Sequence, residues 1–134
     1  MIEFFMPMIP PTVTHQEHRV KILNDKPVFY DGPELKAARA KLTDFLIPHR
    51  PKKVLAEKPL ELVVKWCFPI PESSGHQDGE YRTSKPDTDN LQKLLKDCMT
   101  AVYFWKDDAL VCREIVEKFW AKIPGIYIRI TELE

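Results

Sequence analysis

The most informative stretch of this chain reads Lys85-Pro86-Asp87-Thr88-Asp89-Asn90-Leu91. A second acidic pair, Asp107-Asp108, follows just before a hydrophobic segment. Carboxylates held close together repel one another unless a cation neutralises them. Hard divalent cations prefer oxygen ligands in proteins. The pattern therefore predicts a Mg²⁺ or Mn²⁺ site and metal-assisted phosphodiester chemistry, with ligands from Asp87, Asp89, Asp107 and Asp108.

The residues after the first acidic pair have the period of an amphipathic helix. Asp87 is the expected N-cap, and Asp89 falls where the positive end of the helix dipole favours an anion. Lys93 shares a stripe with Asp89 and Asp97, because these residues are four apart. There Lys93 can contact a phosphate or stabilise a developing negative charge. The predicted buried stripe consists of Leu91, Leu94, Leu95, Cys98, Met99 and Val102.

The segments around this helix predict strands and one further helix. Apolar residues alternate from Leu60 to Phe68, which predicts a strand with one buried face. A chain of 134 residues fits one domain with a real core. We therefore expect residues 1–134 to form a single compact α+β domain, with a mixed β-sheet packed against two main helices. The other expected elements are strands at 2–6, 19–23, 28–30, 111–120 and 126–130, and a helix that begins near 31–34 and ends at 48–51.

Composition narrows the classes of function. The formal net charge is zero, which by itself gives no support to nucleic-acid binding. The chain shows no long apolar run and no signal peptide, so we expect neither a membrane span nor secretion. Cys67, Cys98 and Cys112 form no Cys-x-x-Cys motif, which disfavours a zinc ribbon and favours a reducing cytoplasm.

A polar segment at residues 72–85 precedes the acidic stretch and predicts a long mobile loop. Within it, Tyr81 is a candidate for stacking on an unpaired base. Arg82 and Lys85 are candidates for phosphate contacts. A second basic cluster offers an alternative path for DNA, and it consists of Arg50, Lys52 and Lys53.

Each of these features also has an ordinary structural explanation. Asp-x-Asp at a helix start is a common capping feature, and Asp107-Asp108 can be a solvated turn. Lys93 can be half of an exposed helix pair, and the basic cluster at 50–53 a solvated linker. Trp66 and Trp120 fit the core, whereas Trp105, beside the acids in a loop, is less easily assigned to it.

The combination is more specific than its parts. The run Lys-Pro-Asp-Thr-Asp-Asn-Leu-Gln-Lys at 85–93, then Asp97 and Asp107-Asp108, resembles the RusA family of Holliday junction resolvases. These are small endodeoxyribonucleases, often encoded by prophages. The resemblance covers roughly residues 60–130, and residues 87–93 meet the family pattern Asp-x-Asp-Asn-Leu-x-Lys. It implies that Asp87, Asp89, Asp108 and Lys93 are catalytic and that Asp107 contributes to the site.

The resemblance also implies a mechanism and a partner. Aspartate-bound Mg²⁺ would activate water and stabilise the phosphate. A four-way junction has two-fold symmetry, so we expect a homodimer that supplies two active sites. Two alternatives stay open: a nuclease on other branched DNA or RNA, and a non-catalytic junction-binding protein.

The position of Asp108 poses a geometric problem. A helix over residues 88–102 would be about 22 Å long, and Asp89 and Asp108 would flank its two ends. Either the helix ends early and residues 103–107 fold back, or Asp108 serves the site of another subunit. We expect the fold-back arrangement.

Overall fold

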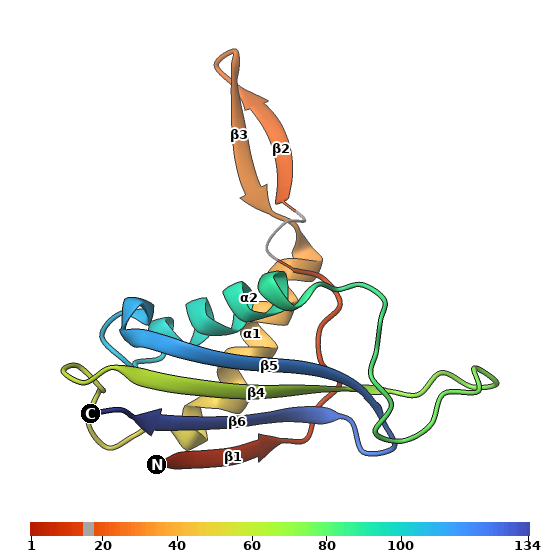
Figure 1. Cartoon of the computed structure of the whole chain (residues 1–134). Helices are drawn as coiled ribbons and strands as arrows, with labels where there is room; N and C mark the ends of the chain where they lie inside the picture. The colour runs from red at the N-terminus through yellow and green to blue at the C-terminus, as the bar shows by residue number, and fades with distance from the viewer. Residues whose placement is uncertain (15–17) are drawn as a thin grey trace.

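Four strands form a mixed sheet in the order β1-β6-β4-β5 (Figure 1). The computed structural model describes residues 1–14 and 18–134. Strand β4 is antiparallel to β6 and parallel to β5, so the fold class predicted from the sequence is confirmed. The strand bounds are Ile2–Met6 for β1, Leu60–Pro69 for β4, Val111–Ala121 for β5 and Gly125–Glu132 for β6.

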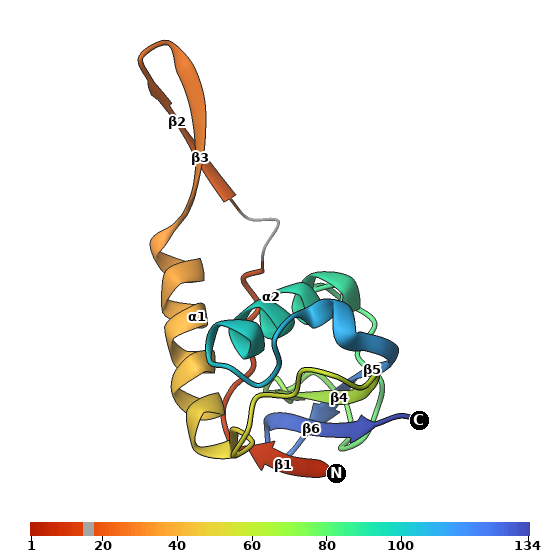
Figure 2. The same ribbon diagram turned by 90° about the vertical axis from the view of Figure 1, so that its left-hand side faces the viewer.

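Two main helices cover one face of this sheet (Figure 2). Helix α1 spans Pro33–Leu46 and α2 spans Thr88–Ala101. Parallel strands need a crossover connection, and α2 lies on the connection between β4 and β5. Two short 3-10 helices, η1 at Ile47–His49 and η2 at Asp108–Leu110, complete the layer. Neither α1 nor α2, nor any other helix in 1–14 and 18–134, has the length and apolar character needed to cross a membrane.

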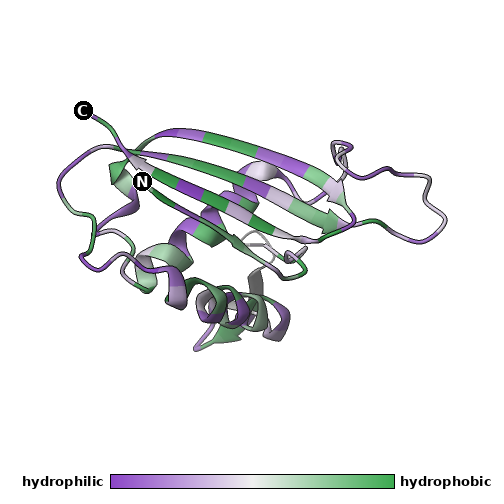
Figure 3. Cartoon of the chain, turned by 90° about the horizontal axis from the view of Figure 1, so that it is seen from below, coloured by the Kyte–Doolittle hydropathy of each residue, from purple (hydrophilic) through white to green (hydrophobic). Residues whose placement is uncertain are grey.

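The core lies between the sheet and the helices, as the two periodicities predict. Along the strands, hydrophobic and hydrophilic residues alternate (Figure 3), and the predicted stripe of α2 is buried throughout. Trp105 is also buried, and its Nε1 donates to Thr100 Oγ1 at 2.7 Å. Trp105, which the sequence pattern did not readily assign to the core, is therefore part of it. The inward face of β4 contributes Leu60, Leu62, Val64, Trp66 and Phe68.

A hairpin projects from the body of the molecule (Figures 1 and 2). It consists of β2 at His18–Leu23 and β3 at Lys26–Asp31. The residues at the turn, Asn24 and Asp25, have φ values of 51° and 61°, which suits a tight hairpin connection between twisted strands. The two predicted strands are thus confirmed, with slightly wider bounds, but they form a sheet of their own.

Gly125 fixes the start of β6 against β1. A Cβ at this position would lie 2.1 Å from Phe5 Cζ and 2.6 Å from the Met6 carbonyl oxygen. No other residue type fits without a shift of the β1 backbone, so this close approach requires a glycine at the start of β6.

Candidate active site

A groove between α2 and the first half of β5 gathers the central predicted residues. Its volume is about 430 Å³, and we call it the α2–β5 groove. Asp89, Lys93 and Asp108 all lie on its walls, within one subunit. Its complete lining is Thr88, Asp89, Gln92, Lys93, Lys96, Asp108, Glu114 and Val116.

A reversal of the chain after α2 brings Asp108 into the groove. The helix continues to Ala101, and Tyr103 then adopts φ 70°. The returning segment is fixed by backbone hydrogen bonds from Phe104 N to Met99 O at 3.0 Å and from Leu55 N to Phe104 O at 3.0 Å. The fold-back arrangement is thus confirmed, although the helix does not end early as that arrangement was expected to require.

Asp107 and Asp108 do different things at this turn. Asp107 is the N-cap of η2, and its Oδ1 accepts a hydrogen bond from Ala109 N at 2.9 Å. Asp108 is the first residue of η2 and lines the groove. Asp107 therefore stabilises the turn that presents Asp108.

Asp87 occupies the predicted N-cap position of α2 without making the predicted cap contact. Its side chain accepts no hydrogen bond from the helix, and its Oδ2 lies 2.7 Å from Lys85 Nζ. The hydrogen bond to Asp87, with the attraction of its charge, raises the pKa of the Lys85 ammonium. Asp87 therefore lies next to the groove at the N-terminal end of α2, paired with Lys85, and is not on its wall.

Lys93 forms an exposed ion pair with Asp97, one turn further along α2, as their spacing allows. Its Nζ lies 3.0 Å from Asp97 Oδ1. The hydrogen bond to Asp97 and the charge of that residue raise the pKa of Lys93, and the charge of Asp108 adds to the effect. Lys93 is therefore protonated at neutral pH and lies within electrostatic range of Asp108.

Three further polar groups of the groove were missed by the sequence analysis. Gln92 is only 4% exposed, Lys96 and Glu114 are partly exposed, and all three are hydrogen-bonded to one another or to the core. A signal for Gln92 was present, because positions 92, 95 and 99 share helical spacing and a buried amide needs a partner. Glu114 alternates with Val116 along β5, but the residue it faces depends on how α2 packs on the strand.

The segment before Asp87 is partly paired with the sheet. Gly79 N donates to Trp120 O and Trp120 N to Glu80 O, both at 2.8 Å, while Arg82 N donates to Lys118 O at 3.0 Å. Residues 72–78 thus form the predicted loop, whereas residues 79–82 extend along the edge of β5.

The candidate DNA contacts in this segment have partners within the protein. The Arg82 guanidinium lies 4.4 Å from the ring centre of Phe68 and 4.5 Å from that of Trp120, and burial lowers the pKa of Arg82. Arg82 also donates to Ser84 Oγ at 3.1 Å. Tyr81 stacks on Phe119 and donates to Glu117 at 2.7 Å. Lys85, paired with Asp87, stays largely exposed.

Lys118 anchors the end of the same segment. Its Nζ donates to the carbonyl oxygens of Ser84 and Pro86, at 2.8 Å each. Burial, followed by repulsion from Arg82, lowers the pKa of Lys118. These contacts fix the backbone immediately before Asp87.

The basic cluster at 50–53 lies outside the α2–β5 groove. Arg50 and Lys52 line a different cavity of about 440 Å³ together with Tyr103, and Lys53 lines a third one. The structure therefore does not bring these cations together with Asp89 and Asp108.

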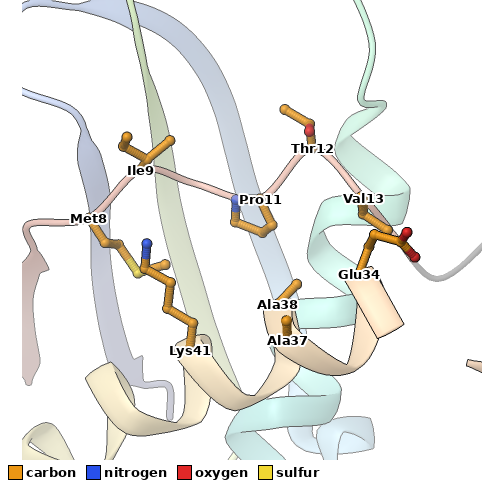
Figure 4. A pocket seen from close by; sticks show the side chains of 9 residues that line it. All are labelled: Met8, Ile9, Pro11, Thr12, Val13, Glu34, Ala37, Ala38 and Lys41. Carbon is orange, nitrogen blue, oxygen red and sulfur yellow. The ribbon is translucent and has the colours of Figure 1, made fainter. Parts of the chain in front are cut away.

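A cavity between residues 8–13 and α1 is largely apolar (Figure 4). Its volume is about 350 Å³, and Glu34 and Lys41 are its charged lining residues. None of the residues predicted for the site lies there, so its position gives it no part in the aspartate chemistry.

The donor set of the groove fits a hard divalent cation. In the described ranges, 1–14 and 18–134, no three acidic, histidine or cysteine side chains are preassembled for a metal ion. Mg²⁺ in phosphoryl-transfer sites is commonly held by one or two carboxylates, with water and substrate phosphate completing its shell. Asp89 and Asp108 suit this role because neither carboxylate forms an ion pair or side-chain hydrogen bond with another described residue.

Comparison with known proteins identifies relatives of this chain. The sequence model described as endodeoxyribonuclease RusA matches residues 9–131. A crossover junction endodeoxyribonuclease, rusA, of Lactococcus phage r1t is 30% identical over 134 residues, covering 98% of this chain and 96% of the phage protein. An uncharacterized protein of Bacillus subtilis strain 168, YqaN, is 32% identical over 94 residues, covering 63% of this chain and 65% of that protein.

Proposed function

This chain belongs to the RusA family of endodeoxyribonucleases, and we propose that it resolves Holliday junctions through chemistry in the α2–β5 groove. Its phage relative, similar along nearly its full length, is named as a crossover junction endodeoxyribonuclease. The observation that carries the assignment of the site is the presence of Asp89, Lys93 and Asp108 on the walls of one groove.

In the proposed reaction, the protein supplies the carboxylates and the cationic side chain around the scissile phosphate. Asp89 and Asp108 would hold the divalent cation, with Asp87 at the N-terminal end of α2 completing or orienting the ligand set. A bound Mg²⁺ or Mn²⁺ supplies Lewis-acid stabilisation of the phosphate and lowers the pKa of bound water. Lys93, already protonated, is in position to meet the negative charge that develops on the phosphate oxygens.

The symmetry of the substrate supports a homodimer as the active form. A four-way junction offers two opposed strands, and two identical subunits related by a two-fold axis place one groove on each. Each groove is built from one subunit, so dimerisation would pair two complete sites. We also propose action in the cytoplasm, where the free thiols of Cys67, Cys98 and Cys112 would stay reduced.

Cleavage of matched DNA substrates tests this function. A labelled four-way junction, a flap and a linear duplex of the same sequence are incubated with the protein, with Mg²⁺ or with EDTA. We expect paired cuts in the junction when Mg²⁺ is present, and no cuts with EDTA. Preferred cleavage of the flap would support a nuclease for other branched substrates, and binding without cleavage would support a junction-binding protein.

A further inference from the structure

A line of hydrogen bonds connects the core to a second lysine in the groove. Trp66 Nε1 donates to Gln92 Oε1 at 2.7 Å, and Gln92 Nε2 donates to Glu114 Oε2 at 2.6 Å. The other oxygen of that carboxylate, Oε1, accepts from Lys96 Nζ at 3.0 Å. Trp66 is fully buried and Gln92 nearly so, so the line begins at a fixed point and ends at the wall of the groove.

Trp66 and Gln92 restrict the rotation of the Glu114 side chain. An indole N–H can only donate, so it determines which end of the Gln92 amide faces Trp66. The amide NH₂ group then necessarily points toward β5, where it meets Glu114. A carboxylate held on one oxygen by a buried amide has lost most of its rotational freedom before Lys96 binds to the other oxygen.

Both lysines of the groove are paired with carboxylates other than the predicted metal ligands. Lys93 is paired with Asp97 and Lys96 with Glu114, at 3.0 Å each. Asp89 and Asp108, which line the same groove, form no ion pair with a described residue. An ammonium group on a flexible side chain would compete with a metal ion for these carboxylates if nothing held it elsewhere.

We propose that Lys96 is a second phosphate-binding lysine of the site, and that Glu114 and Gln92 are positioning residues that hold it away from Asp89 and Asp108. This inference rests on the proposed function. An ammonium group has three N–H donors, and Glu114 accounts for one of them. The side chain of Lys96 is 22% exposed, so its remaining donors are accessible to a phosphate oxygen at the groove wall.

Metal binding without DNA tests the positioning role. Mn²⁺ is titrated by calorimetry into the wild type, Glu114→Gln, Lys96→Gln and the double variant. We expect Glu114→Gln to weaken Mn²⁺ binding by about 10-fold, within the range of coupling between members of one hydrogen-bond network, because the released Lys96 would compete for Asp89 and Asp108. In the Lys96→Gln background the same change should alter affinity by no more than about twofold, because the lysine that Glu114 holds is already absent.

Glu117→Gln is the matched control for this cycle. Glu117 is on the same strand, but it bonds Tyr81 and lies outside the groove, so Mn²⁺ affinity should stay at the wild-type value. If Glu114→Gln weakened Mn²⁺ binding equally with and without Lys96, the positioning role would be overturned. Glu114 would then act on the metal directly, as a ligand or through its charge.

Junction binding tests the phosphate contact. Affinity is measured over a salt series in EDTA, where no cleavage is expected. For Lys96→Gln, the slope of log affinity against log salt should fall by about 0.9, the value for one lost phosphate contact with duplex DNA. Lys96→Arg should keep the wild-type slope, and Lys36→Gln on the exposed side of α1 serves as the charge-matched control. An unchanged slope for Lys96→Gln would overturn the contact.

The metal site and the positioning role of Glu114 can be refuted separately. If Asp89→Asn binds Mn²⁺ as tightly as the wild type, the metal site assigned under the proposed function is wrong. If Asp89→Asn loses Mn²⁺ while Glu114→Gln retains full affinity, the metal site stands and the positioning role alone is refuted.

Discussion

Asp89 is the carboxylate on which the assigned chemistry most directly depends. It lies in the first turn of α2, where the helix dipole favours an anion, and it points into the groove without an ion-pair partner among the described residues. Asp87, two residues earlier, is already paired with Lys85. This difference makes Asp89 the sharper test of metal-assisted cleavage.

We expect Asp89→Asn to abolish junction cleavage and preserve junction binding. The amide keeps the shape of the side chain but is a much poorer ligand for a hard cation. Losing a negative charge near phosphates should leave affinity equal or higher. Cleavage with Mg²⁺ and gel-shift affinity in EDTA are measured side by side, with Asp44→Asn on α1 as the control. Full activity of Asp89→Asn would remove this residue from the catalytic set.

Lys93→Ala should lower turnover strongly and stability only slightly. The exposed pair with Asp97 contributes about 0.5 kcal/mol or less to folding. Loss of one charge-stabilising contact in a transition state costs about 2.7–4 kcal/mol by analogy with an oxyanion donor, which is a 10²–10³-fold loss in rate. Single-turnover cleavage rates and thermal melts give both values. A wild-type rate would leave Lys93 as an ordinary surface lysine.

At the scale of elements, α2 and the segment at 79–87 position the residues proposed to be catalytic. Helix α2 packs on the sheet through its apolar stripe. Backbone hydrogen bonds attach the segment at 79–87 to β5, and the side chains of Arg82 and Lys118 hold it in place. Both elements act on the acidic residues through backbone position, so disturbing either should change the site without touching a carboxylate.

Arg82→Ala should lower stability without changing the salt dependence of junction binding. Its guanidinium lies over Phe68 and Trp120, and cation–π contacts of this kind are worth about 0.5–2 kcal/mol each. We expect unfolding free energy to fall by roughly 1–2 kcal/mol, with an unchanged salt slope for junction binding because the side chain is engaged internally. Denaturant unfolding and a salt series check this. A slope reduced by about 0.9 would assign Arg82 a phosphate contact instead.

The packing of α2 predicts how the thiols react. Burial raises the pKa of Cys98 to about 11, whereas Cys112 is exposed. The thiolate is the reactive form, so at pH 8 Cys98 stays protonated and inert in the folded protein. Alkylation followed by peptide mass mapping should modify Cys112 rapidly and Cys98 only in denaturant. Rapid labelling of Cys98 without denaturant would show that α2 is not packed as described.

At the scale of the whole molecule, zero net charge must be reconciled with a polyanionic substrate. The acidic groove carries lysines of its own, and a bound cation would cancel further negative charge locally. Local arrangement can therefore support DNA binding where the overall charge does not. In the proposed function, two such grooves, one from each subunit of a dimer, would act together on the symmetric junction.

Mixed dimers test this pairing of sites. Differently tagged wild-type and Asp89→Asn chains are co-refolded, and the heterodimer is isolated through both tags. On a supercoiled plasmid with an extruded cruciform, we expect the heterodimer to give nicked circles, because only one groove can cut. Doubly tagged wild-type dimers should give linear product. Linear product from the heterodimer at the wild-type rate would show that one subunit makes both cuts.

The sequence by itself determined the main helices and strands. The alternation of apolar residues in β4 and the apolar stripe from Leu91 to Val102 each determine which face of the element is buried, because a strand repeats every two residues and a helix every 3.6 or about that. The spacing likewise put Asp89 and Lys93 on one stripe of α2, since four-residue steps on a helix are a local property. The choice of Asp108 as a catalytic residue came from the resemblance to the RusA family.

Only the tertiary structure decided which distant residues meet. The reversal at Tyr103 returned Asp108 alongside α2, and the packing of α2 on β5 placed Glu114 opposite Gln92 and Lys96. Contacts of this kind depend on the relative position of two packed elements, which no local period encodes. For the same reason Arg82, a candidate phosphate ligand from the sequence, is found over the rings of Phe68 and Trp120.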